Sequence, residues 1–436
     1  MDLDRLAALR TPTGSAALAA AAELTGGDPL VAAATLRSAG VPGDLAAAAL
    51  TQAELRRRGT AKFGPAGAEM FFTRAGLEQA TRAAVADRRA ARLHAAGVRV
   101  LADLGCGLGA DALAAARAGI RVYGVEADPL TAAIATANAA AAGLAELFTV
   151  ECADATTVDL AGLGGTGVDA VFCDPARRRA GSGRRVFDPA SYSPPWDFVL
   201  SLTRRVPRTV LKVAPGIDHG LIPPGAEAEW VSVGGDLVEA TLWCGPLAQV
   251  PRRATLLPAV TAATGKAPTA TAGTPGGAQL TGTGGVEAEV GPVRRYLYDP
   301  DGAVIRAHLV AEFAETVRGT LADPSIAYVY ADVAVRTPYA RCLEVRETMP
   351  FSLKRLRSLL RDRGVGRLEI LKRGSALDPE RLRRDLRLAG GASASLVLTR
   401  VAGAPTVLIC QPVATPLVTT PPAATPRRSP PRAGGW

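Results

Sequence analysis

Residues 98–129 constrain the fold of this chain more than any other stretch. They combine an apolar strand, a glycine-rich turn, a helix and a second strand that ends on a carboxylate. The turn contains Gly105, Gly107 and Gly109, and glycine permits both the backbone conformations and the close ligand approach that such a turn requires. This order of elements is typical of the first half of a doubly wound α/β domain, which binds its ligands at the carboxyl ends of the parallel strands.

The charges beside this turn discriminate between two kinds of ligand. The spacing Gly105-x-Gly107-x-x-Ala110 also fits a dinucleotide fingerprint. A pyrophosphate favours backbone N–H groups without nearby anions. Here Asp103 lies two residues before the first glycine, and Asp111 follows the turn directly. Carboxylates at these positions suit a ligand with an ammonium and a sulfonium group, so the sequence predicts S-adenosyl-L-methionine as the cofactor.

Three later strands are expected at 121–125, 147–152 and 168–173, and each ends near a carboxylate. Glu126 follows Asp103 at the spacing at which a carboxylate accepts both ribose hydroxyls. Asp154 is placed to accept a hydrogen bond from the adenine amino group. We therefore predict a cofactor site formed by Asp103, Gly105, Gly107, Gly109, Glu126, Ala127, Asp154, Ala155 and Asp174.

The motif after the strand at 168–173 is Asp174-Pro175-Ala176-Arg177-Arg178, and from it we predict Asp174, Pro175 and Arg177 as catalytic residues. A carboxylate near an incoming nucleophile can accept its proton or orient an amine. The proline makes the loop rigid. The arginines can donate two hydrogen bonds to a phosphate or a carbonyl edge, or they can pair with nearby acidic side chains.

The rest of the chain divides by its patterns. A strand at 209–213 and an antiparallel pair within 228–245 complete a seven-stranded, mainly parallel sheet. The loop at 62–72 either lines the substrate cleft or packs its aromatic side chains under the sheet, and a helix of about 20 residues should run from Thr73 to His94. The expected order is a helical region at 1–95, the α/β domain at 96–250, a linker or long loop at 251–292, a connecting segment at 293–338, an α+β domain at 339–412 and a disordered tail at 413–436.

The α+β domain is strongly basic. Between Arg336 and Arg400 there are 16 Lys and Arg residues against 7 Asp and Glu, an excess equal to the formal net charge of +9 of the whole chain. A helix at 352–363 should bury its leucines and expose Lys354, Arg357 and Arg361, and Lys372, Arg373, Arg381 and Arg384 extend this basic stripe. Such a stripe would contact phosphates without reading sequence, or it is a solvated arginine-rich surface.

Composition excludes several classes. No apolar run reaches the roughly 18 residues of a membrane span, and the N-terminus lacks the order of a signal peptide. The six cysteines are scattered and the three histidines lie far apart in sequence. We therefore expect a cytoplasmic protein with reduced thiols and without a metal site.

The motifs DLGCGLGAD, VEAD, ECAD and CDPARR resemble those of class I S-adenosylmethionine-dependent methyltransferases. The flanking stretches KFG…FTRAGLEQAT and YARCLEVRETMPFSLKRLRSLLRDRGVGRLEILKRGSALDPERLRRDLRL are similar to the bacterial family that adds a C-terminal THUMP-like domain. The resemblance implies a Rossmann-like methyltransferase fold, a cofactor site at Asp103, Gly105, Gly107, Glu126 and Asp154, and a substrate-facing loop at 174–178. Ala176 replaces the second proline common in related RNA-modifying enzymes, and no aromatic residue follows it.

The sequence therefore predicts a methyltransferase that acts on a base of structured RNA, such as tRNA or rRNA, by direct in-line transfer. Two rivals stay open at this point. One is a methyltransferase for a protein or small molecule, with the basic domain as a docking surface. The other is a non-catalytic RNA-binding protein that keeps the fold as a scaffold. The methylated atom, the oligomeric state and the role of the first 57 residues stay undetermined.

Overall fold

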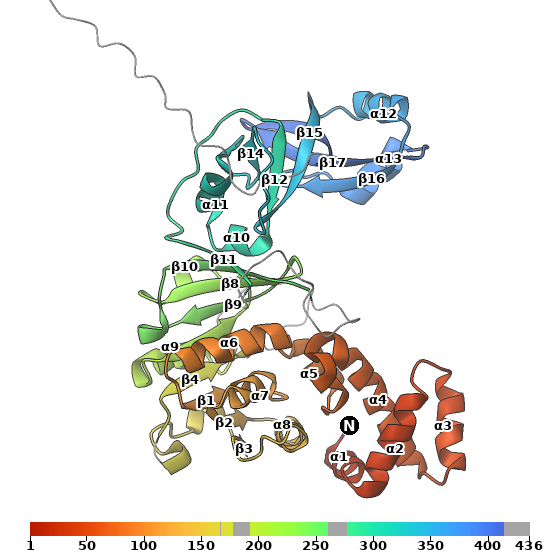
Figure 1. Ribbon diagram of the computed structural model, residues 1–436, viewed down its shortest axis with the longest axis vertical. Coiled ribbons are helices and arrows are strands. Elements are labelled where there is room, and N and C mark those ends of the chain that lie inside the picture. Colours follow the sequence, from red (N-terminus) through yellow and green to blue (C-terminus); the bar gives the residue numbers. More distant parts are fainter. Residues whose placement is uncertain (166, 178–191, 260–276, 414–436) are drawn as a thin grey trace, which may run out of the picture. The chain divides into compact units, whose positions relative to one another are not determined.

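The computed structural model describes residues 1–165, 167–177, 192–259 and 277–413. The chain forms two compact units, Met1–Gly282 and Thr283–Trp436. Each unit has a β-sheet and a hydrophobic core of its own, as Figure 1 shows for the sheets.

The first unit begins with a group of four helices, which Figure 1 shows gathered at one end of that unit: α1 (Leu3–Leu9), α2 (Pro12–Glu23), α3 (Pro29–Ser38) and α4 (Gly43–Phe63). Helix caps explain the breaks between them. The side chain of Thr11 accepts a hydrogen bond from the backbone N–H of Gly14, and that of Asp28 accepts one from the N–H of Leu30. A proline occupies the first turn of the helices that these residues cap, α2 and α3.

The single helix predicted from Thr73 to His94 is wrong, because the chain forms two helices there, α5 (Arg74–Gln79) and α6 (Ala83–Ala95). Thr73 is the N-cap of α5, as predicted. The chain leaves the helical conformation at Ala80, and the hydroxyl of Thr81 then donates a hydrogen bond of 2.6 Å to Asp111. A tertiary contact thus overrides the local helix propensity of an alanine-rich stretch.

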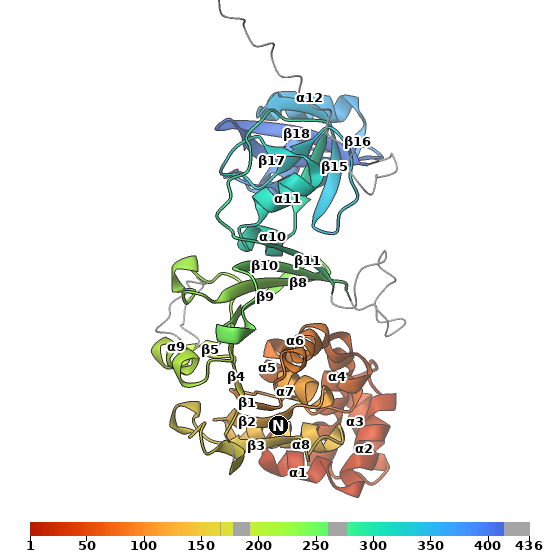
Figure 2. The same ribbon diagram turned by 60° about the vertical axis from the view of Figure 1, so that its left-hand side comes forward.

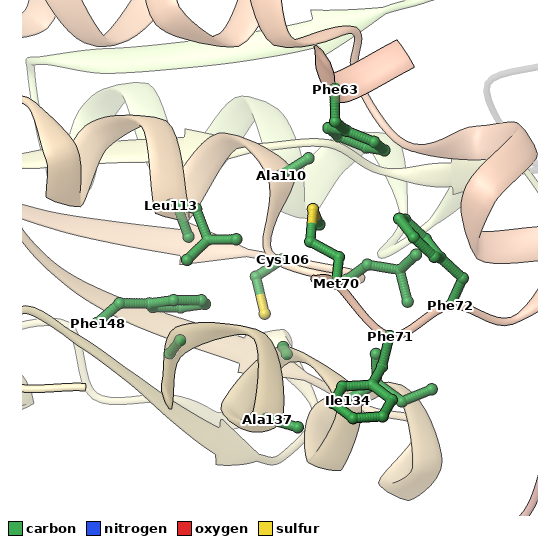
Figure 3. Packing of buried hydrophobic residues seen from close by; sticks show 14 of the residues in the cluster. Phe63, Met70, Phe71, Phe72, Cys106, Ala110, Leu113, Ile134, Ala137 and Phe148 are labelled. Atoms are coloured by element: carbon green, nitrogen blue, oxygen red, sulfur yellow. The ribbon is translucent and has the colours of Figure 1, made fainter. Parts of the chain in front are cut away.

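One hydrophobic core joins the helical region to the first helices of the α/β domain. Phe63, Phe71 and Phe72, from the end of α4 and the loop after it, are buried among residues of α7 (Ala110–Arg117) and α8 (Pro129–Ala141). Figure 3 shows these side chains in a single packed cluster. The loop at 62–72 was expected either to line the substrate cleft or to pack its aromatic side chains. Its three phenylalanines are packed in the core.

The first unit contains a nine-stranded sheet in the order β11-β10-β8-β9-β7-β4-β1-β2-β3. The five strands β3, β2, β1, β4 and β7 are parallel, and β9 forms antiparallel pairs with β7 and β8. The bounds are β1 (Val100–Leu104), β2 (Arg121–Glu126), β3 (Phe148–Cys152), β4 (Ala170–Cys173), β7 (Thr209–Val213), β8 (Glu227–Val233), β9 (Asp236–Trp243), β10 (Arg252–Leu257) and β11 (Ala278–Gly282). The mainly parallel α/β fold is confirmed, and the carboxyl ends of β1 to β4 meet at one edge of the sheet.

The linker predicted at 251–292 needs correction, because residues 252–257 and 278–282 within it are strands of this sheet. Strand β10 pairs in parallel with β8, and β11 pairs antiparallel with β10, which raises the number of strands from the predicted seven to nine. Figure 2 shows these strands beside β8 and β9. Ala254 and Leu257 of β10 and Leu280 of β11 are buried. Burial of these few apolar side chains stabilises the two strands, which the sequence did not predict because the residues around them are rich in Thr and Gly. Residues 260–276 lie outside the described part.

The second unit is built on a seven-stranded sheet in the order β13-β14-β12-β15-β18-β17-β16. Its elements are β12 (Tyr296–Pro300), α10 (Gly302–Arg306), α11 (Val310–Val317), β13 (Thr320–Leu321), β14 (Val329–Ala331), β15 (Ala340–Pro350), α12 (Leu353–Asp362), β16 (Val365–Lys372), α13 (Pro379–Leu386), β17 (Ala392–Val401) and β18 (Ala404–Pro412). The segment at 293–338, predicted as a connection, therefore contributes three strands to the same sheet. The tail predicted to be disordered lies outside the described residues after position 413.

Two further findings concern the described residues alone. No helix among them is long and apolar enough to cross a membrane. No group of three or more His, Cys, Asp and Glu side chains is arranged to hold a metal ion.

Candidate active site

The glycine turn between β1 and α7 adopts the conformation that its sequence predicts. Gly105, Gly107 and Gly109 have φ angles of 82°, 57° and 85°, in the left-handed region that favours glycine. A Cβ atom on Gly109 would lie 2.7 Å from the ring of Phe148, whereas one on Gly107 would meet nothing within 4 Å. The turn is therefore packed at Gly109 and leaves the backbone open to a ligand at Gly107.

Glu126, at the end of β2, lies against this turn. Its Oε2 accepts a hydrogen bond of 3.0 Å from the backbone N–H of Gly107, and its Oε1 accepts one of 3.0 Å from the N–H of Asp128. Each carboxylate oxygen has further lone-pair capacity for a hydroxyl donor. Ala127 follows as an exposed residue. The predicted ribose-binding carboxylate is thus fixed at the turn by two backbone groups.

Asp154 lies after β3 and caps the short 3-10 helix η2 (Ala155–Thr157). Its Oδ1 accepts hydrogen bonds from the backbone N–H and the hydroxyl of Thr156, at 2.8 and 2.7 Å. These hydrogen bonds hold the pKa of Asp154 below its usual value. Because both contacts use Oδ1, the other oxygen is available to a donor such as the amino group of an adenine.

Asp103, at the carboxyl end of β1, is a buried carboxyl group that no hydrogen-bond donor in the described part of the chain contacts. Its residue is 1% exposed, and neither carboxylate oxygen has a hydrogen-bond partner among the described residues. Burial raises the pKa of Asp103 well above its usual value, and the nearby carboxylates of Asp111 and Asp174 raise it further. A buried carboxyl group in this state fits a site that receives a cation from a ligand.

Asp111 does not play the part that its position in the sequence suggests. Its carboxylate is directed to other residues, since it accepts hydrogen bonds from Thr81 and from the buried guanidinium of Arg89. Arg89 pairs with this carboxylate, and so Asp103 is the carboxyl group left to a cationic ligand. The prediction that both carboxylates attract the ligand is corrected to one of them.

Asp174 follows β4 and forms an ion pair that the sequence did not predict. Its Oδ2 accepts a hydrogen bond of 2.6 Å from the ammonium of Lys212 on β7. Pro175 is buried beside it. Arg177 lies in the two-residue strand β5 (Ala176–Arg177), which pairs with β6 (Tyr192–Ser193), and Arg178 lies outside the described residues.

A chain of buried polar groups continues from Lys212 under the site. Lys212 also donates to the hydroxyl of Thr81 at 3.0 Å, and Thr81 donates to Asp111. Arg89 joins Asp111 to Glu239 and lies over the ring of Phe172, 4.5 Å from its centroid. The sequence did not predict this network of polar groups. Its one local signal is Lys212, which lies between the apolar residues Leu211 and Val213 in the strand Thr209–Val213.

The arrangement fits S-adenosylmethionine on the evidence of the chain itself. The carboxyl of Asp103, which no hydrogen-bond donor of the described residues contacts, matches an ammonium, and the open turn at Gly107 permits close backbone approach. Glu126 and Asp154 lie at the ends of the next two parallel strands, β2 and β3. These residues would hold the amino acid, the ribose and the adenine parts in turn.

The second unit has the predicted basic helices, but the stripe differs from the prediction. Arg357 is half-buried and donates to the backbone carbonyl of Asp385, and Arg373 pairs with Asp299 at 2.6 Å, so both have structural partners. We call the exposed basic residues of the two packed helices the α12–α13 basic surface, which consists of Lys354, Arg355, Arg361, Arg381, Arg383, Arg384 and the adjoining Arg387.

Comparison with known proteins adds three family matches. A family described as a methyltransferase domain matches residues 102–176, a family described as THUMP domain-like matches residues 340–412, and a domain family of unknown function matches residues 2–59. The chain is 35% identical over 374 residues to a protein of Mycobacterium tuberculosis named as an uncharacterised S-adenosylmethionine-dependent methyltransferase, with 82% of this chain and 95% of the relative covered.

The fold is also similar to that of a candidate methyltransferase from Porphyromonas gingivalis W83. The two structures superpose with a TM-score of 0.67 at 20% sequence identity, over 92% of this chain and 99% of the other. This likeness covers both units and supports the architecture described above.

Proposed function

Because the chain belongs to the family of S-adenosylmethionine-dependent methyltransferases, we propose that it methylates a base of structured RNA, at a ring or amino nitrogen, by direct in-line transfer. The bound cofactor supplies a methyl group that is already activated on a sulfonium. The residues of the chain therefore have to bind the cofactor, orient the acceptor atom and exclude water. We assign the binding of the amino group to Asp103, that of the ribose to Glu126 and that of the adenine to Asp154.

Asp174 with Pro175 is the proposed acceptor-facing group. Its side chain is 35% exposed, so part of the carboxylate can reach a ligand at the carboxyl edge of the sheet. The peptide carbonyl of the same residue lies close to the glycine turn, since a Cβ atom on Gly105 would be 3.3 Å from it. The backbone of Asp174 thus lies beside the glycine turn, which supports its assignment as the acceptor-facing group.

The observation that supports RNA as the substrate is the charge of the THUMP-like domain. None of Lys354, Arg355, Arg361, Arg383, Arg384 and Arg387 forms an ion pair with a described residue, and only a pair of 3.9 Å is present for Arg381. Unpaired cations on two adjoining helices suit a ligand that is itself a polyanion. The exposed acidic residues of the same two helices are Asp362 and Glu380, so cations predominate on this surface.

A groove beside these helices is also lined in part by arginine side chains. It has a volume of about 620 Å³, and Arg341 of β15, Arg367 of β16 and Arg383 of α13 contribute to its lining. Arg341 is neutralised by Glu369, whereas Arg367 is held by the hydroxyl of Ser393 at 3.2 Å. Arg383 belongs to both the groove and the α12–α13 basic surface, so an RNA backbone can follow one continuous path.

A transfer assay tests this proposal. The purified chain is incubated with S-adenosylmethionine carrying a labelled methyl group, and with the RNA, protein and small-molecule fractions of cells that lack it. We expect label in RNA, and digestion should place it on a nucleobase. Label in protein or in small molecules alone would assign the enzyme to another substrate class, and RNA binding without transfer would favour a scaffold.

A further inference from the structure

We propose that Lys212 is a positioning residue for methyl transfer, which holds the carboxylate of Asp174 in one orientation. This inference rests on the proposed acceptor-facing role of Asp174. The two side chains are in direct contact, since the Lys212 ammonium lies 2.6 Å from Oδ2 of Asp174.

The two partners differ in exposure. The side chain of Lys212 is 13% exposed and that of Asp174 is 35% exposed. Lys212 is therefore the more buried partner of the pair, and part of the Asp174 carboxylate stays exposed to solvent. The ammonium engages Oδ2, so Oδ1 is the less engaged oxygen, and we assign it to accept a hydrogen bond from an acceptor N–H group.

Lys212 is itself fixed through Thr81, which is tied in turn to groups of α7, α6 and β9. Thr81, between α5 and α6, accepts a hydrogen bond from Lys212 and donates one to Asp111 of α7. Arg89 of α6 then ties Asp111 to Glu239 of β9. A long lysine side chain without such contacts would sample many rotamers, but this one is held at its tip.

The buried charges around Lys212 favour its ammonium form. Burial alone would lower the pKa of Lys212, but the carboxylates of Asp174, Glu239 and Asp111 outweigh it and raise the pKa above the usual value. The contact of 2.6 Å between this ammonium and Oδ2 holds the Asp174 carboxylate in place, and the geometry therefore favours orientation of the acceptor by Asp174.

The reaction balances without a protein base. The acceptor nitrogen donates its lone pair to the methyl carbon, and the carbon–sulfur bond breaks with its electron pair left on sulfur. The proton that the methylated nitrogen gives up passes to solvent water. Oδ1 of Asp174 accepts a hydrogen bond from the acceptor N–H beforehand, so that the lone pair points at the methyl carbon.

The test compares Lys212→Met, Lys212→Arg and Asp174→Asn, alone and as the double variant Lys212→Met with Asp174→Asn. Binding of S-adenosylhomocysteine is measured by calorimetry, and transfer is measured on the fraction that accepts label from the unmodified enzyme. We expect Lys212→Met to lower kcat by about 10- to 100-fold, with the KM for the acceptor and the affinity for S-adenosylhomocysteine nearly unchanged. Lys212→Arg should restore much of the loss.

The double variant separates positioning from a general structural role. If Lys212 acts through Asp174, removal of Lys212 costs little further activity once Asp174 is changed, because the two effects are not additive. A kcat for Lys212→Met equal to that of the unmodified enzyme, or fully additive losses, would overturn the inference. Label found in protein instead of RNA would contradict the proposed substrate and leave these comparisons valid, and absence of transfer to any fraction would overturn both proposals.

Discussion

The backbone N–H of Gly107 donates a hydrogen bond of 3.0 Å to Oε2 of Glu126, which joins the glycine turn to the end of the neighbouring strand. The same carboxylate is the group that we assign to the cofactor ribose. Glu126 therefore shapes the turn before the cofactor binds, and its loss should affect binding through both contacts.

We predict that Glu126→Ala abolishes measurable binding of S-adenosylmethionine in calorimetry. Loss of two hydrogen bonds to a charged group costs about 3–6 kcal/mol, or roughly 100-fold or more in affinity. Glu126→Gln is the matched control, because it keeps an oxygen acceptor for Gly107 and should retain weak binding. Near-normal affinity of Glu126→Ala would contradict the site assignment.

Cofactor binding should release a proton from Asp103. In the free protein the raised pKa of Asp103 keeps the proton on to a higher pH than is usual for an aspartate. The ammonium of the ligand favours the carboxylate and lowers that pKa, so binding releases the proton and the affinity rises with pH in the window between the two pKa values.

The groups around Asp103 determine this effect and offer its control. Asp111 and Asp174 raise the pKa of Asp103, while Arg89 and Lys212 oppose them. Calorimetry in two buffers with different ionisation enthalpies measures the released proton directly. Asp103→Asn should abolish the difference between the buffers, and a difference that survives in this variant would assign the proton to another group.

The α12–α13 basic surface should bind RNA by its charge. We predict that Arg361→Glu and Arg384→Glu each weaken RNA binding and reduce the slope of log affinity against log salt by about one unit. Arg37→Glu, an exposed arginine on α3 in the first unit, carries the same change of charge and serves as the control. Equal effects of all three variants would indicate that only the net charge matters.

The ion pairs of Glu227 should stabilise the first unit against acid. Glu227 is fully buried, and its carboxylate is bound by Arg92 and Arg253. Burial opposes the charged form, but hydrogen bonds from Arg92 and Arg253 outweigh it and lower the pKa of Glu227 to about 2. A lowered pKa contributes stability that is present above the unfolded value of 4.5 and is lost as the pH falls through about 2.

Glu227→Gln removes this contribution, takes the acidic partner from Arg253 and leaves Arg92 with its longer pair of 3.5 Å to Glu229. We expect the free energy of unfolding at pH 7 to fall by about 3–5 kcal/mol. Urea unfolding at pH 7 and pH 3 measures it, and the deficit of the variant should be smaller at pH 3. The exposed pair of Arg117 with Asp87 gives the control, since Asp87→Asn should cost less than about 1 kcal/mol.

The sequence was sufficient to predict the positions of the carboxylates at the carboxyl ends of the parallel strands. Asp103, Glu126, Asp154 and Asp174 lie where the order of strands and turns predicted them, because each position depends on local pattern and on the common edge of the sheet. Their roles in binding and catalysis are still predictions.

Contacts between distant residues could not be predicted in this way. Lys212 lies 131 residues from Thr81 and 38 from Asp174, and no local pattern encodes those distances. The break between α5 and α6 has the same origin, since the Thr81 hydroxyl contacts Asp111 and Lys212 where a continuous helix was expected. Arg357 looked exposed because helical periodicity alone does not include the neighbouring helix α13.

The central claim is tested most directly by mass spectrometry of nucleosides from RNA of cells that lack this protein. We predict that one methylated base disappears, returns when the intact gene is supplied, and stays absent when the supplied gene encodes Asp174→Ala. A nucleoside profile that is unchanged in the deletion strain would contradict the claim that this methyltransferase acts on RNA.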